Sequence, residues 1–196
     1  MYYKFIDENN CGYNGFDYSE YLPRDGQPGT PLPTVEGEII PCENGYHACR
    51  RESVSRWIKA QLYEVELTGT LVDGDDKTAA SDIRIIRKVD AWNERTQRLF
   101  AVWCAREALK LVDNPNPRCI AACDVAERYA NGDAPWDATM DVAWAAAMYA
   151  ARDAAINAAT AAARASDADW CATWDAAMNA ARDALSSRLL EMCGEV

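Results

Sequence analysis

Hydrophobic and polar positions follow one pattern before Val89 and another after it. Before Val89, short segments alternate with a period of two residues, which is typical of half-buried strands. In Leu62 to Gly69 the large apolar side chains fall on one face and two glutamates fall on the other. Tyr2 to Ile6 and Ile83 to Val89 are also expected to be strands. The pattern predicts a small, mostly antiparallel sheet domain over residues 1–90.

Turn residues and prolines separate these strands. Gly37 to Cys42 reads as a short strand, and Asn44-Gly45 after it is a turn signal because both residue types tolerate a positive φ. Ser53 is expected to cap a short helix. Prolines keep Arg24 to Pro33 out of helices and central strands, so we expect this segment to be an exposed, mobile excursion. Asp73 to Asp76 reads as a turn.

Ala-rich helical patterns fill the chain after Val89. About four helices are expected, at residues 91–113, 118–130, 134–165 and 167–193. In the first of them the large apolar side chains fall near one face, and they are Trp92, Leu99, Phe100, Trp103 and Leu109. We therefore expect an all-α, Ala-rich helical bundle over residues 91–196. The predicted fold class of the whole chain is α+β.

The last two expected helices contain an internal repeat. Trp144, Met148, Arg152 and Asp153 recur thirty residues later as Trp174, Met178, Arg182 and Asp183. Ala lets helices approach closely and sparse Trp and Met supply volume, so the repeat is first a packing unit. The alternative is an exposed aromatic patch that contacts a partner, for which Trp136 and Trp170 are the candidates. Helices that close on themselves and helices that pair in a homodimer both remain open.

Composition and charge narrow the classes of partner. The chain has 49% hydrophobic residues and a formal net charge of −11, with a pI near 4.6. Direct binding of nucleic acid is not expected, since it needs a basic surface. The start of the chain shows no signal-peptide pattern, and no apolar stretch of about 18 residues is free of charge. We expect no contact with a membrane and a location in the cytoplasm.

Eight cysteines raise the question of disulfides and metals. In a reducing compartment disulfides are not expected, and Cys119 and Cys123 read as small core residues. A zinc site could combine His47 with three cysteines: Cys11, Cys42 and Cys49. Their spacing matches no zinc signature, so we expect neither a metal nor another cofactor.

His47 is the only histidine, and it lies in the stretch CENGYHACRR. Any catalytic triad would need it, but no nucleophile elbow and no phosphate-binding glycine loop occurs in the sequence. We predict that the stretch forms a turn that places His47 and Cys49 in the core, with Arg50 and Arg51 at its rim. The alternative is a histidine that faces a ligand or partner beside the two arginines.

Three motifs in residues 1–90 resemble a small domain of unknown function that is common in bacteriophage and prophage proteins. They are Gly45-Tyr46-His47-Ala48-Cys49, Tyr63-Glu64-Val65-Glu66 and Lys77-Thr78-Ala79-Ala80. Arg98 to Ala134 resembles the start of Ala-rich helical proteins known as immunity proteins of bacterial toxin systems. These resemblances imply a phage accessory protein and bring no catalytic residues.

The expected function is therefore an interaction. The chain would bind a bacterial host protein in the host cytoplasm and modulate or inhibit it, in an anti-defence, host-takeover or cytotoxic role. Two alternatives stay open. One is an enzyme similar to ADP-ribosyltransferases, with His47, Arg50 and Glu64 as its candidate residues. The other is an acidic mimic of DNA, which requires aspartates arrayed along one helix face.

Overall fold

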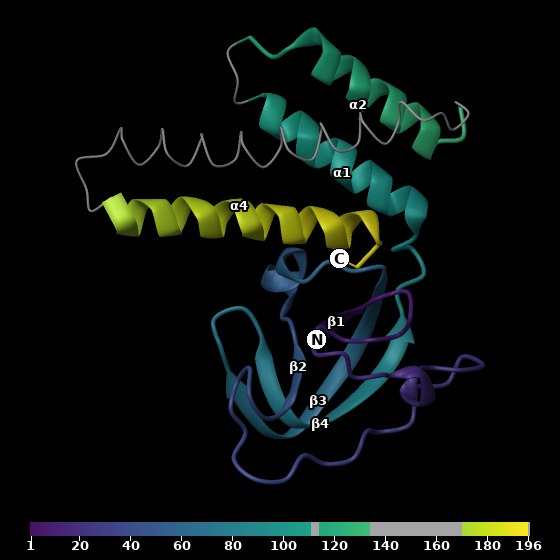
Figure 1. Cartoon of the computed structure of the whole chain (residues 1–196), viewed down its shortest axis with the longest axis vertical. Coiled ribbons are helices and arrows are strands. Elements are labelled where there is room, and N and C mark those ends of the chain that lie inside the picture. Colours follow the sequence, from purple (N-terminus) through teal and green to yellow (C-terminus); the bar gives the residue numbers. More distant parts are fainter. Residues whose placement is uncertain (111–113, 134–169, 196) are drawn as a thin grey trace. The chain divides into compact units, whose positions relative to one another are not determined.

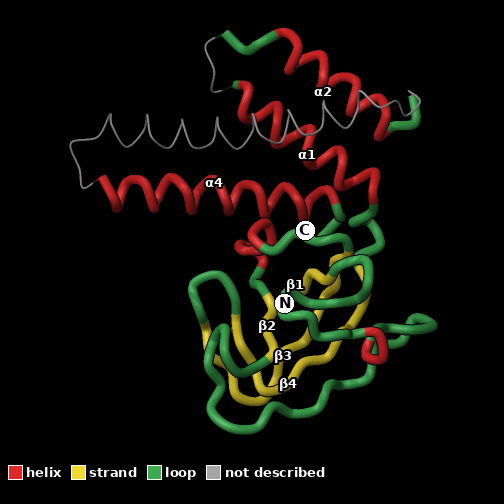
Figure 2. Tube along the Cα trace, viewed as in Figure 1, coloured by secondary structure: helices red, strands yellow, loops and turns green. Residues whose placement is uncertain are grey.

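The computed structural model describes residues 1–110, 114–133 and 170–195, and the side chains of 171–178 lie outside the description (Figure 1). Strands fill the first part of the chain and helices follow, so the fold is α+β as predicted (Figure 2). The chain divides into two compact units. The sheet unit consists of Met1–Asn93 together with Leu189–Val196, and the helical unit consists of Glu94–Arg188. The sequence-based boundary lay near the same place but gave the last residues to the helices.

The sheet unit contains a curled antiparallel sheet of four strands in the order β1-β3-β4-β2. The strands are β1 (Tyr2–Ile6), β2 (Tyr46–Ala48), β3 (Gln61–Asp73) and β4 (Thr78–Lys88). The long β3–β4 hairpin closes where Gly74 N donates to Lys77 O at 2.8 Å, so the predicted turn is confirmed. The alternating strands of the sequence are confirmed too, and β3 and β4 are longer than predicted.

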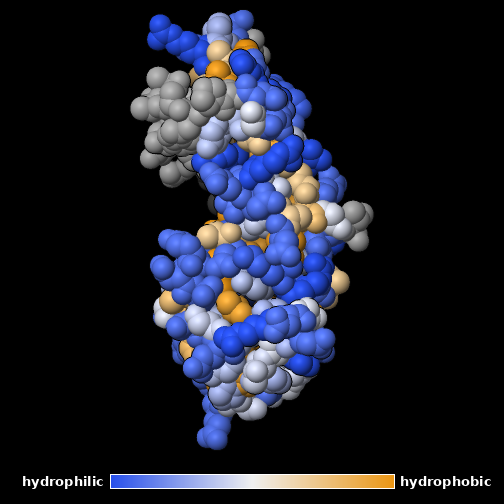
Figure 3. Space-filling model, turned by 90° about the vertical axis from the view of Figure 1, so that its right-hand side faces the viewer, coloured by the Kyte–Doolittle hydropathy of each residue, from blue (hydrophilic) through white to orange (hydrophobic). Residues whose placement is uncertain are grey.

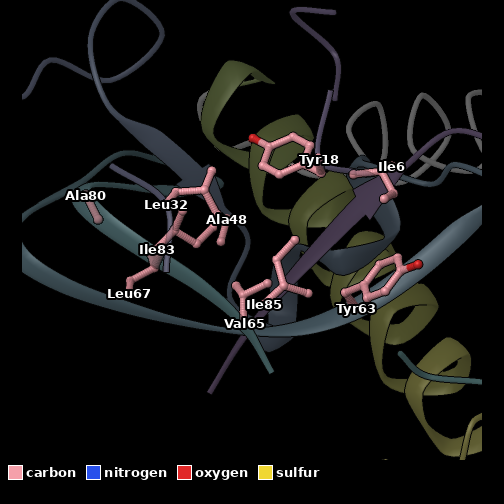
Figure 4. Packing of buried hydrophobic residues seen from close by; sticks show 10 residues of the cluster. All are labelled: Ile6, Tyr18, Leu32, Ala48, Tyr63, Val65, Leu67, Ala80, Ile83 and Ile85. Carbon is pink, nitrogen blue, oxygen red and sulfur yellow. The ribbon is translucent and has the colours of Figure 1, made fainter. Parts of the chain in front are cut away.

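The alternation buries one continuous hydrophobic cluster (Figure 4). Its side chains come from all four strands and from two loop residues, and they are Ile6, Tyr18, Leu32, Ala48, Tyr63, Val65, Leu67, Ala80, Ile83 and Ile85. Ile85 is fully buried at the centre of β4. Large, branched side chains therefore hold this unit together, as expected for a pleated surface that is covered on one side.

A proline-rich segment covers the edge of β4 beyond β2, which corrects the prediction of an exposed excursion. Gly29, Leu32 and Val35 donate backbone hydrogen bonds to β4 carbonyls at 2.8, 3.1 and 2.8 Å. Donors spaced by three residues match the period of extended proline-rich chains, so the prolines between them cost no bond. A Cβ on Gly29 would lie 1.8 Å from Tyr21 O, so this position requires glycine. The segment thus protects an edge that would otherwise be open.

The region around His47 differs locally from the sequence prediction. No strand forms over Gly37–Cys42, where the structure has only an isolated bridge between Ile40 and Asn44. The left-handed residue of the turn is Cys42 with φ of 71°, instead of Asn44. The short helix is a 3₁₀ helix over Arg51–Arg56 without a side-chain cap, so the predicted cap at Ser53 is wrong. Ser53 is instead buried.

The helical unit contains a closely packed helix pair, α1 (Glu94–Leu109) and α2 (Pro117–Ala130). The side chain of Asn116 accepts from Arg118 N at 3.0 Å and caps α2, and Gly132 ends it with φ of 81°. The residues buried between the helices are Val102, Ala105, Cys123 and Ala126. The helix at 118–130 was therefore predicted almost to the residue.

The face that packs differs from the large apolar face expected for the first helix. Trp92 precedes α1 and lies in the sheet unit, where its ring meets Phe5 edge-on at 5.8 Å. Val125 on α2 is 38% exposed, while Cys123 and Ala126 are buried. Small side chains allow the two helix backbones to approach closely, and this outweighs the larger area of the bulky residues.

The last described helix is α4 (Trp170–Met192), which carries the second copy of the repeat. Its end, from Leu189, and the tail after it belong to the sheet unit. There Arg87 of β4 bridges Glu64 at 2.7 Å and Glu195 at 2.6 Å. The helix expected at 134–165, the first copy of the repeat and Trp136 lie outside the described residues.

Candidate functional site

The site lies at the seam between the two edge strands of the curled sheet. Tyr3 of β1 and Cys49, just after β2, exchange two backbone hydrogen bonds at 2.9 and 2.8 Å. Hydrogen-bonded pairs alternate along an antiparallel ladder, so Phe5 and His47 would form the next such pair. Lys4 intervenes instead, and its Nζ donates to the His47 carbonyl oxygen at 2.7 Å. The ammonium group takes the place of a ladder bond, and the seam opens beyond the Tyr3–Cys49 pair.

A cavity of about 420 Å³ opens beside this seam. Its walls come from β1, from the loop after it, from the His47 stretch and from the residues before β3. Aromatic side chains form much of the lining, and they are Tyr3, Phe5, Tyr13, Phe16, Tyr18, Tyr46 and Trp57. Lys4, His47, Lys77 and Glu43 supply the ionisable groups. This size and composition are typical of pockets that bind small molecules.

Lysines of the protein lie over three of the aromatic rings around the cavity. Lys4 Nζ lies 4.8 Å from the centroid of the Tyr18 ring, and Lys77 Nζ lies 4.3 Å from that of Trp57. Lys59 Nζ lies 4.4 Å from the Tyr13 ring and also bridges Asp7 at 3.4 Å. Cation–π attraction therefore already holds these rings in place.

His47 has a defined protonation state. Its Nε2 accepts a hydrogen bond from Cys42 N at 2.8 Å, so the proton of the neutral ring is on Nδ1. Burial lowers the pKa of His47, and the charges of Lys4 and Lys77 lower it further. The ring is neutral at pH 7, and its Nδ1 has no acceptor among the described residues.

Trp57 contributes a second donor without a partner. Its indole N–H is buried in the cavity wall and meets no acceptor in the described part of the chain. A buried donor without an acceptor costs about 1–3 kcal/mol. An acceptor group brought by a ligand would recover part of that free energy.

The two cysteines of the His47 stretch differ in reactivity. Cys49 is buried and its Sγ donates to Tyr3 O at 3.1 Å. Burial raises the pKa of Cys49 to about 12, so this thiol stays protonated and unreactive. Cys42 is exposed and serves the site through its backbone N–H to His47. Among the described residues no three ligands of His, Cys, Asp or Glu type gather to hold a metal ion.

The sequence-derived site residues fall in different places. His47 lines the cavity and is half-buried, whereas Cys49 is in the core as predicted. Arg50 does not line the cavity, since it is paired with Glu52 and Asp73, both at 2.9 Å. Arg51 is exposed at the start of the 3₁₀ helix.

Of the two tryptophans proposed as partner contacts, Trp170 begins α4 with its side chain outside the description, and Trp136 lies outside the described residues. The residues that sequence reasoning missed are Lys4, Tyr13, Trp57 and Lys77. Lys4 left one signal, a charged residue inside an otherwise apolar strand.

The enzyme alternative needs a carboxylate beside His47. Glu64 does not supply it, because its carboxylate pairs with Arg87 at 2.7 Å and does not line the cavity. The carboxylate in the lining is that of Glu43, which is exposed. The geometry therefore brings His47 together with lysines and aromatic rings instead of with Arg50 and Glu64.

Comparisons with known proteins leave this site to be interpreted from its own geometry. No protein-family model, no curated protein and no solved structure matches the chain. Within the described residues no helix is both long and apolar enough to cross a membrane.

Proposed function

We propose that the sheet unit binds a small anionic ligand with a planar group in the aromatic cavity at the seam. One observation carries this proposal: donors without acceptors surround the cavity. They are the ammonium of Lys77, the Nδ1–H of His47 and the indole N–H of Trp57. Aromatic walls would stack on the planar part of the ligand, and the donors would hold its negative end.

The charge of the cavity favours an anion over a cation. Lys4 and Lys77 form no ion pair with any described carboxylate, and lysines already occupy the faces of Tyr18 and Trp57. A cationic ligand would have to displace them. Glu43 is exposed at the cavity, so water screens its charge. The cavity thus has the opposite sign to a chain whose net charge is −11.

Benzoate and its cationic counterpart benzylamine test this proposal on the full chain. We expect benzoate to bind, as followed by the fluorescence of the protein's tryptophans and by calorimetry, and benzylamine not to bind. Lys77→Gln should weaken benzoate about tenfold or more, since a hydrogen bond to a charged group contributes about 1.5–3 kcal/mol. Lys110→Gln is the matched control, because Lys110 is exposed on the helical unit. Equal binding of both compounds, or of neither, would refute the proposal.

A protein partner is the second candidate function, and an exposed apolar rim favours it. Tyr13 is 58% exposed, Ile58 is 38% exposed, and Tyr13 Oη donates to Ile58 O at 3.3 Å. Phe16 adds a third exposed ring to the cavity lining. On the face drawn in Figure 3 hydrophilic residues dominate and hydrophobic ones form small groups, so such a rim stands out.

The proposed partner is a bacterial host protein that the chain modulates or inhibits in the host cytoplasm, as the phage resemblance implies. An acidic side chain of that protein would enter the cavity while its apolar surface covers the rim. A pull-down from bacterial lysate should enrich one protein with the wild type and lose it with Tyr13→Ser. Retention of the partner by Tyr13→Ser and its loss after removal of the helical residues would place the contact elsewhere.

For the helical unit we propose the Ala-rich bundle that the sequence predicts, closed on itself or paired with a second copy of the chain. The small-residue contact between α1 and α2 supports this, because Ala and Cys permit close helix packing. Light scattering coupled to gel filtration gives the oligomeric state directly. The aspartates expected for a DNA mimic lie mostly outside the described residues, and a competition assay with duplex DNA tests that alternative.

A further inference from the structure

Lys4 is a second functional group of the seam, and its surroundings differ from those of a surface lysine. Its Nζ has one hydrogen-bond acceptor, the His47 carbonyl at 2.7 Å, and lies over the Tyr18 ring at 4.8 Å. No carboxylate of the described residues pairs with it. Its exposed surface faces the cavity that it lines. The amine therefore meets any ligand that occupies the cavity.

The same surroundings favour the neutral amine. Burial lowers the pKa of Lys4 to about 8, and the charge of Lys59 lowers it further, while Cys49 acts in the opposite direction. An ordinary lysine has a pKa of about 10.4 and carries almost no free amine at pH 7.5. At that pH roughly a quarter of Lys4 would be the free amine, which is the nucleophilic form.

We propose that Lys4 captures the carbonyl group of a ligand as an imine, so that the cavity takes an aldehyde or ketone that also carries an anionic group. This inference rests on the proposed function, because Lys77 and His47 would hold the anionic end while Lys4 reacts with the carbonyl end. The aromatic walls exclude bulk water from the bond that forms.

The step is balanced without an oxidant or a reductant. The lone pair of Lys4 Nζ forms a bond to the carbonyl carbon, and the C=O π pair moves to the oxygen. The resulting carbinolamine loses that oxygen as water, which takes both protons of the amine, and the neutral imine remains. Water reverses the step and releases the ligand.

The test uses 4-formylbenzoate, an anionic planar aldehyde, with cyanoborohydride on the full chain at pH 7.5. Peptide mapping by mass spectrometry then gives the rate of labelling of each lysine. We expect Lys4 to react at least about tenfold faster than Lys110, since the pKa difference alone gives about a 200-fold larger amine fraction. Lys4→Arg should remove this fast site and leave the labelling of Lys110 unchanged.

The dependence on pH separates the reactive amine from mere proximity. Lys4 labelling should level off near pH 8, whereas Lys110 labelling should keep rising to above pH 10. The ionisable groups that face Lys4 and shape this profile are Tyr18, His47, Cys49 and Lys59, with Glu43 and Lys77 across the cavity.

Benzoate, which has no carbonyl group to react, separates the two proposals. Fast labelling of Lys4 that benzoate slows supports both. Benzoate binding without a Lys4 adduct overturns the imine and leaves the anion site standing. Fast labelling that neither benzoate nor Lys77→Gln affects keeps the reactive lysine and refutes the anion site. Labelling of Lys4 at the rate of Lys110 overturns the imine.

Discussion

The sheet unit and the helical unit are held together by side chains of opposite size. In the sheet unit the fully buried residues include Tyr3, Ile6, Leu62 and Ile85, which fill the space beneath a curled sheet. Between α1 and α2 the buried residues are small, with Ala105 and Ala126 among them. A sheet leaves a thick layer to fill, whereas two helices can close the distance between their backbones. The first unit should therefore be sensitive to loss of volume and the second to added volume.

The largest effect is expected from removing volume in the sheet unit. Ile85→Ala should lower the free energy of unfolding by about 3–4 kcal/mol, because it leaves a cavity in the centre of the cluster. Ile40→Ala is the matched control, since Ile40 is exposed, and it should cost less than about 0.5 kcal/mol. Hydrogen exchange followed by mass spectrometry measures both and resolves the two units. Equal losses for the two variants would contradict the assigned core.

A smaller effect is expected from adding volume to the helix pair. Ala126→Leu should destabilise the helical unit by about 1–3 kcal/mol, because the close contact with Val102 and Ala105 has no room for it. Ala121→Leu places the same side chain on the exposed face of α2 and should be nearly neutral. Exchange protection of α1 and α2 is the readout. A more stable Ala126→Leu variant would mean that the contact is loosely packed.

The smallest effect is expected from the ion pairs that join the same helices. Arg106 on α1 bridges Asp124 at 2.9 Å and Glu127 at 2.6 Å on α2. These side chains are partly exposed, so Arg106→Gln should cost no more than about 1 kcal/mol, and the difference should shrink in 1 M salt. A loss above about 2 kcal/mol that salt does not change would show that charge contributes more than size to this contact.

The sheet was predictable because its strands carry their pattern locally. Alternation in Leu62 to Gly69 depends only on which face is buried, and the turn at Asp73 to Asp76 needs only its own residues. The cover on β4 was missed because proline content indicates no regular structure and does not show which strand a segment lies beside. The face of α2 was missed because Cys123 and Ala126 carry little hydrophobic signal, although they pack most closely.

The site was predictable only where it is unusual in the sequence. His47 drew attention as the only histidine, and it does line the cavity. Lys4, Trp57 and Lys77 come from three separate segments, and only the curling of the sheet brings them to one seam. Arg50 was a reasonable candidate by composition, but nearby carboxylates neutralise it. Which charged residue remains without a partner depends on contacts distant in sequence, which spacing does not encode.

The assignment of Leu189–Val196 to the sheet unit affects how the protein is made on the ribosome. The ion pair from Glu195 to Arg87 cannot form until the helical residues between them have been synthesised. At about 5–20 residues per second, the roughly 100 residues between β4 and this segment take on the order of 5–20 s. During that interval the nascent sheet lacks its final segment, so its completion is delayed until after the helices have emerged.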